Sequence, residues 1–116
     1  MNLIRLQRRQ HPARPYPELR QETVLDSGNR FLDDVANLYV DDNRELRFVD
    51  VLTRGFIGLG RKHHLVPVEP IAEQGPGAIT LGVDQETVER APRFANPYVG
   101  PDEEQQRATR EHYGYG

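Results

Sequence analysis

The chain has 116 residues, of which 36% are hydrophobic and nine are prolines, and this predicts one small domain with tails. Because there is no cysteine, a disulfide scaffold, a thiolate metal site and thiol catalysis are excluded. The net charge of −3 combines a basic leader with an acidic body, whereas nucleic-acid-binding domains usually carry their basic excess on the folded body.

The first 21 residues form a basic, proline-bearing leader. Residues 1–20 hold five arginines against one glutamate, Glu18. The leader and the C-terminal tail are poor in aliphatic residues, so we expect both to lie outside the core. The N-terminus also lacks an apolar stretch of about 7–15 residues for a signal peptide, or about 18 for a spanning helix. This predicts a cytoplasmic protein without an integral membrane segment.

Three arginines of the leader, Arg5, Arg8 and Arg9, fall near helical spacing. A short basic segment of this kind is typical of a contact with RNA or with an anionic membrane surface. The alternative interpretation is a solvated tail without a binding role.

The folded region is expected to begin near Glu22. Residues 23–25 predict a short strand, and the turn-forming residues 26–29 follow it. Residues 32–40 fit either a helical turn or an irregular entry into a strand. A turn at residues 41–43 and a returning apolar stretch at 46–52 predict a hairpin over residues 36–52.

Residues 49–71 predict two strands joined by a glycine-rich loop. The glycines at 55, 58 and 60 suggest a phosphate loop, but their spacing differs from the dinucleotide fingerprint and no Lys-Ser/Thr pair or helix follows. We therefore interpret the loop as a structural connection. Its apolar residues Phe56, Ile57 and Leu59 are predicted to form a contact surface, because exposed apolar loops are often interaction sites.

The C-terminal third is predicted to hold a turn at residues 73–78, a strand at 79–83 and two helices. Asp84 is a candidate N-cap for a short helix ending near Arg90, before Pro92. Asp102 is a candidate cap for a last helix to about Tyr113. This helix has almost no apolar face, and we include Tyr113 in the predicted contact surface.

Candidate catalytic and metal-binding side chains are few. His63 and His64 are adjacent on a predicted strand, so they point to opposite faces and do not readily share a metal ion. The pairs Asp33-Asp34 and Asp41-Asp42 suggest a cation site, an acid–base pair or, as the interpretation we favour, solvated turn carboxylates. Ser27, the only serine, lies in a turn. We therefore predict no catalytic, cofactor-binding or metal-binding residues, and no cofactor.

Four stretches in order resemble one known family: residues 35–41, a strand closed by Asp41; residues 46–51; the glycine loop 55–60 with the Leu-Val-Pro-Val-Glu strand 65–69; and residues 83–92, ending in Ala-Pro. Together they resemble the PRC-barrel domain. A related barrel occurs in the cytoplasmic domain of the photosynthetic reaction-centre H subunit and at the C-terminal end of ribosome maturation factors. The chain departs from the family pattern at Asp33, where a glycine is common.

The resemblance implies a mainly β fold, a small antiparallel PRC-type β-barrel with short helices after the barrel and at the C-terminus. The barrel domain would span residues 22–96, with the leader before it and a linker and helix at 97–116. The family implies a non-enzymatic interaction or assembly module, and we expect a homodimer or larger assembly. The alternatives are an RNA- or ribosome-associated factor that uses the arginine leader, and a peripheral membrane-complex assembly factor.

Overall fold

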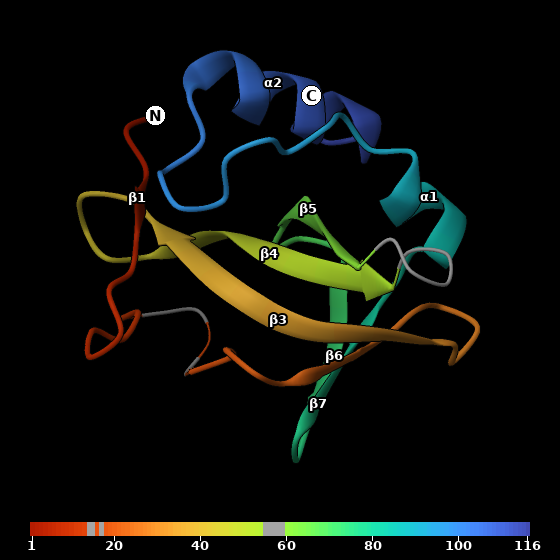
Figure 1. Ribbon diagram of the computed structural model, residues 1–116. Coiled ribbons are helices and arrows are strands. Elements are labelled where there is room, and N and C mark those ends of the chain that lie inside the picture. The colour runs from red at the N-terminus through yellow and green to blue at the C-terminus, as the bar shows by residue number, and fades with distance from the viewer. Residues whose placement is uncertain (14–15, 17, 55–59) are drawn as a thin grey trace.

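The computed structural model describes residues 1–13, 16, 18–54 and 60–116, which form a mainly β structure with two short helices (Figure 1). The strands are β1 (Ile4–Arg5), β2 (Thr23–Leu25), β3 (Phe31–Val40), β4 (Leu46–Arg54), β5 (Arg61–Pro67), β6 (Ile71–Gly75) and β7 (Ala78–Leu81). The helices are α1 (Gln85–Glu89) and α2 (Glu103–His112). Both helices lie on one side of the sheet, and the chain between them crosses β4 and β5 (Figure 1).

All seven described strands belong to one sheet, in the order β5-β4-β3-β2-β7-β6, and β1 pairs with β3. The described ladders do not join β5 to β6, so they do not close the sheet. The pair β2–β7 is parallel, and this corrects the expected all-antiparallel arrangement. These strands are far apart in the sequence, so no hairpin forces them to run in opposite directions.

The predicted hairpin is confirmed, and it is longer than expected. Residues 32–40, which were ambiguous between helix and strand, all belong to β3, and β3 pairs with β4 in antiparallel register. The side chain of Asp41 accepts hydrogen bonds from the backbone N–H groups of Asn43 and Glu45 (2.8 and 3.0 Å), which shapes the turn. Asp41 is therefore a structural turn residue.

Strand β4 is buried on both faces, and each face contributes to its own cluster. The larger cluster includes Leu38 and Val49, with Val88 of α1 packed among them. The smaller cluster holds Leu3, Tyr39, Phe48, Leu65 and Phe94. The two clusters follow from the alternation of side chains along β3 and β4.

The expectation that both tails lie outside the core is wrong. Leu3 and Leu6 flank β1 and are buried, one in each cluster, and Leu19 has no exposed surface. Tyr113 is also buried in the larger cluster. The physical reason is pairing: β1 forms a ladder with the end of β3, so a few leader side chains cover apolar surface that would otherwise meet water.

Both predicted helix caps are confirmed. The Asp84 side chain accepts from the Thr87 N–H, and the Asp102 side chain accepts from the Gln105 N–H (both 2.8 Å). The turn predicted at residues 73–78 is too wide, because β6 continues to Gly75 and pairs with β7. Only Pro76 and Gly77 form the turn. Pro76 lies outside the ladder, so its missing N–H group costs no hydrogen bond between the strands, and Gly77 adopts a φ of +77°. Within the described residues, no helix is long and apolar enough to span a bilayer.

Candidate functional site

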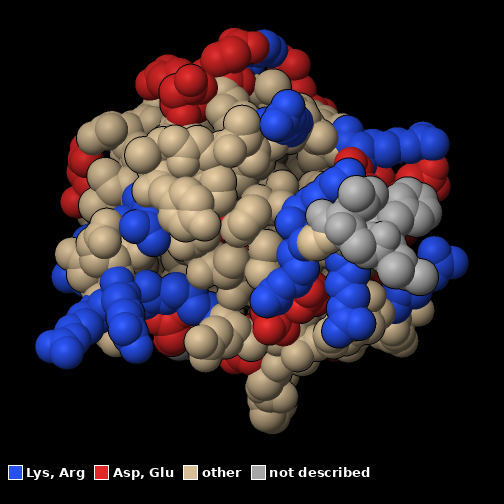
Figure 2. Space-filling model, viewed as in Figure 1, with Lys and Arg blue, Asp and Glu red and all other residues tan. Residues whose placement is uncertain are grey.

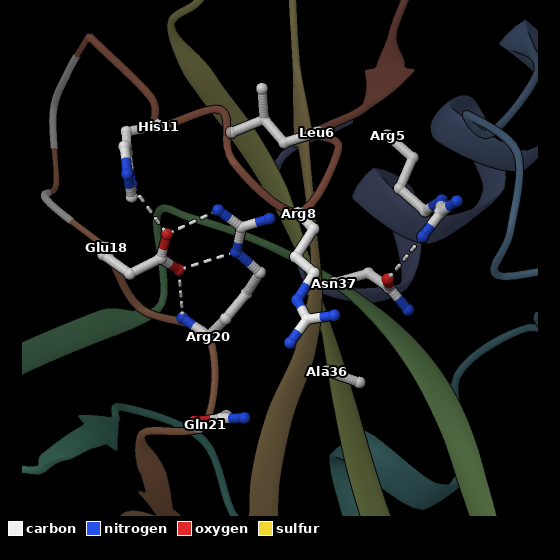
Figure 3. A pocket seen from close by; sticks show the side chains of 9 residues that line it. All are labelled: Arg5, Leu6, Arg8, His11, Glu18, Arg20, Gln21, Ala36 and Asn37. Atoms are coloured by element: carbon white, nitrogen blue, oxygen red, sulfur yellow. Dashed lines mark hydrogen bonds and ion pairs between the residues drawn. The ribbon is translucent and has the colours of Figure 1, made fainter.

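An open pocket of about 450 Å³ lies between the leader and the sheet (Figure 3). Strand β1 supplies Arg5, and the turn after it, closed by a hydrogen bond from Gln10 N to Gln7 O (2.9 Å), supplies Arg8. Arg20 comes from a second turn, and Asn37 comes from β3. Leader residues that are distant along the chain from β3 therefore share one concave site with it.

Arg20 is the structural centre of this pocket. Its guanidinium group donates to both carboxylate oxygens of Glu18 and to the carbonyl oxygens of Gln7 and Gln10. The side-chain hydrogen bond from Arg20 is the main reason why the pKa of Glu18 falls from 4.5 to about 2, against the opposing effect of burial. Glu18 also lies 3.0 Å from Nδ1 of His11. These contacts join the two turns of the leader.

Arg5 is held between the pocket and the chain that precedes α2. Its Nε donates to the carbonyl oxygen of Tyr98 (3.0 Å), and one terminal nitrogen lies 3.4 Å from Oδ1 of Asn37. The guanidinium carbon lies 5.8 Å from the centre of the Tyr98 ring, a cation–π distance. Arg5 is thus ordered by its neighbours, in contrast to Arg8 and Arg9, which are exposed and make no hydrogen bond or ion pair to a described residue.

Next to Arg5 lies a group of exposed apolar side chains, Ile4, Tyr98 and Val99, which we call the β1 patch. They are 51%, 67% and 56% exposed. The two chain segments that carry the patch lie side by side, because Gly100 packs so closely on the backbone of Leu3 that an added Cβ would lie 1.8 Å from its carbonyl oxygen. Figure 2 shows an uncharged area where the chain between α1 and α2 crosses the sheet, with basic side chains below it and acidic ones above it around α2.

A polar chain runs from Arg5 across the sheet to a second pocket. Asn37 donates to Oδ2 of Asp50 (2.8 Å), and Nδ1 of His63 lies 2.7 Å from the same oxygen. Asp50 has no exposed surface, and its other oxygen has no hydrogen-bond partner among the described residues. His63 lines a pocket of about 490 Å³ beside Lys62 and Arg93.

His63 and His64 point to opposite faces of β5, as the sequence predicts. His64 lies 2.7 Å from the hydroxyl of Thr53 on the other face, and burial lowers its pKa. The described residues hold no group of three or more His, Asp or Glu side chains that is arranged to bind a metal ion.

Two of the four carboxylates singled out in the sequence, Asp33 and Asp41, have structural partners, whereas Asp42 is exposed. Asp41 is buried beside Arg47, and although burial opposes it, the hydrogen bonds from Arg47 and two backbone N–H groups lower its pKa. Asp33 is buried and lies 3.4 Å from a guanidinium nitrogen of Arg61. Neither aspartate has the exposed side chain expected of a solvated turn carboxylate.

Of the four residues of the predicted contact surface, the structure describes only Tyr113. Phe56, Ile57 and Leu59 lie outside the described residues. Tyr113 is only 8% exposed and packs in the core, so its side chain does not offer a surface on this chain. Sequence reasoning missed the β1 patch. Tyr98 and Val99, two large apolar residues in a proline- and glycine-flanked linker, were the signal that could have indicated it.

A scan against models of protein families gives no match to this chain, and a search of curated proteins gives none either.

Proposed function

We propose that this chain is a non-catalytic interaction module, built on a PRC-type barrel, that associates with a second copy of itself through the β1 patch. The order of the strands supports the barrel. The two outermost strands of the sheet, β5 and β6, are consecutive in the chain and are separated only by residues 68–70. So short a connection keeps the two edges close at one end, as a small barrel requires.

The observation that carries the proposal is the exposure of Ile4, Tyr98 and Val99 on two chain segments that pack against each other. Each is a large apolar side chain, and Tyr98 is held in place by Arg5. Ordered aromatic side chains contribute strongly to protein contacts, because little conformational entropy is lost when they are buried.

Charge favours a second copy as the partner. One end of the β1 patch adjoins α2, since Gln106 donates to the carbonyl oxygen of Met1 (2.7 Å). The first turn of α2 holds Glu103 and Glu104, which stay exposed although they pair with the Met1 ammonium group and with Arg107. The other end continues into the turn with the exposed Arg8 and Arg9. A surface with acidic and basic ends is self-complementary across a two-fold axis, where each acidic end meets the basic end of the partner.

Sedimentation velocity over a wide range of concentration tests this proposal. The wild-type chain is expected to form a dimer, and the double variant Tyr98→Ser with Val99→Ser is expected to weaken the association by about tenfold or more. The control is Phe31→Ser, which removes an aromatic side chain that is also more than half exposed, at the start of β3. A monomer at every concentration, or an equal loss in the control, would overturn the proposal.

A further inference from the structure

We propose that the pocket between the leader and β3 binds a phosphate dianion, either free or as the phosphate group of a small monoester. This ligand site does not require self-association, although two of its lining residues, Arg5 and Arg8, adjoin the β1 patch. It rests on the charges that surround the pocket, on the ordering of its side chains and on a cation, Arg8, that has no partner among the described residues.

The pocket has an excess of positive charge. Three guanidinium groups, those of Arg5, Arg8 and Arg20, line it, and Glu18 is the only carboxylate among the described lining residues. His11 lies on the Glu18 side of the pocket, with its Nδ1 3.0 Å from a Glu18 carboxylate oxygen. Like charges gathered around a concave surface repel one another, and an anion between them removes that repulsion.

Two of the cations are fixed before any ligand arrives. Arg20 is held by Glu18 and by two backbone carbonyl groups, and Arg5 is held by Asn37 and Tyr98. A guanidinium group has five N–H donors, so Arg5 keeps donors that are not used in these contacts. Preorganised donors bind more tightly because their ordering cost has been met during folding.

Arg8 is the cation of the site that no described residue holds in place. It lines the pocket and makes no hydrogen bond or ion pair to the described part of the chain. In Figure 3 it extends between the Glu18–Arg20 pair on one side and Asn37 on the other. Guanidinium groups match phosphate oxygens well, because they donate two parallel hydrogen bonds.

The shape of the site favours a small ligand over a nucleic-acid strand. The volume of about 450 Å³ is typical of small-molecule pockets. The described lining contains no Phe, Tyr or Trp side chain on which a base would stack, whereas single-stranded nucleic-acid sites usually have such platforms.

Isothermal titration calorimetry with inorganic phosphate and with ribose 5-phosphate tests the proposal on the full chain. We expect saturable binding of at least one of them, weakened about tenfold or more by Arg8→Gln through the loss of a charge-assisted hydrogen bond. The matched control is Arg9→Gln, which removes the same charge from the adjacent exposed position outside the described lining, and it is expected to change affinity by less than about twofold. Binding by the monoester alone would identify it as the ligand class, and equal binding of both would identify the phosphate group as sufficient.

Three results would overturn the proposal. The first is no binding of either probe by the wild-type chain. The second is equal weakening by Arg8→Gln and Arg9→Gln, which would mean that net charge and not the pocket attracts the anion. The third is binding only to a single-stranded RNA or to phosphatidylglycerol vesicles, which would indicate an extended contact of the leader instead. Thermal unfolding of both variants checks that each remains folded.

Discussion

Nδ1 of His63 lies 2.7 Å from Oδ2 of Asp50, a carboxylate that is fully buried between β3 and β5. Asn37 donates to the same oxygen, while the other oxygen has no partner among the described residues. A buried charge with an unsatisfied oxygen costs stability, and the contacts of Asn37 and His63 with Oδ2 offset part of this cost. The pair therefore links the charge state of a buried group to folding.

The variant Asp50→Asn tests that link. Burial raises the pKa of Asp50 above 3.8, although hydrogen bonds from Asn37 and His63 oppose the shift. A carboxyl with a raised pKa in the folded state contributes stability below its ordinary pKa and loses that contribution as pH rises through the folded pKa. Asparagine does not titrate, so the free energy of unfolding of the variant, relative to wild type, is expected to increase as pH rises above 3.8.

Urea unfolding at a series of pH values measures this difference. Asp84→Asn is the control with the opposite sign, because hydrogen bonds from Thr87 lower the pKa of Asp84. The stabilising contribution of Asp84 is present above pH 3.8 and is lost as pH falls through the lowered pKa. The free energy of unfolding of Asp84→Asn is therefore expected to fall furthest below that of the wild type at neutral pH. Parallel stability curves for Asp50→Asn and wild type would contradict the linkage.

Leu6→Ala tests whether the leader belongs to the core. The Leu6 side chain is 3% exposed and packs in the larger cluster, so its truncation is expected to cost about 2–5 kcal/mol of unfolding free energy. Ile4→Ala is the matched control on the same segment. Because Ile4 is exposed on the single chain, its change is expected to stay within about 0.5 kcal/mol when unfolding is measured at a concentration too low for self-association. Chemical denaturation of both variants measures the difference, and equal small effects would mean that the leader does not stabilise the fold.

The elements that the sequence predicts correctly depend on local signals. The aspartates at 84 and 102 each bond an N–H group three residues on, and the turn at residues 41–43 is closed by the side chain of Asp41. Such contacts involve neighbours in the chain, so their residue types are sufficient to indicate them.

The elements that the sequence did not predict depend on distant partners. The burial of Leu3 and Leu6 follows from the pairing of Ile4 with Val40, and the parallel pairing of Thr23 with Ala78 has no local signature. The candidate sites likewise depend on residues that are distant in the sequence. Arg5 contacts Tyr98, which is 93 positions further along the chain, so neither the pocket nor the β1 patch could be derived from spacing alone.

Gly100→Ala tests the contact that joins the chain before α2 to the leader. An added Cβ would lie 1.8 Å from the carbonyl oxygen of Leu3, and because this atom belongs to the backbone, the two segments must separate. We expect a cost of about 1–3 kcal/mol in urea unfolding. Gly75→Ala is the control, because a Cβ at that position has open space around it. A neutral result at Gly100 would contradict the close packing of the two chain segments that carry the β1 patch.

Glu18→Gln tests the ion pair that holds the phosphate pocket together. The hydrogen bond from the Arg20 side chain is the main cause that lowers the pKa of Glu18 to about 2. The folded-state pKa is below the ordinary value of 4.5, so the pair stabilises the fold above that value, and the contribution is lost as pH falls from 4.5 towards 2. Since Glu18 is about one-third exposed, we expect the variant to cost only about 1 kcal/mol of unfolding free energy at neutral pH, and only a small part of that at pH about 2. Urea unfolding at both ends of this range measures the loss. His11→Gln removes only the weakest cause of the shift and is expected to retain most of the acid dependence, so an equal effect of the two variants would show that Arg20 is not the dominant partner.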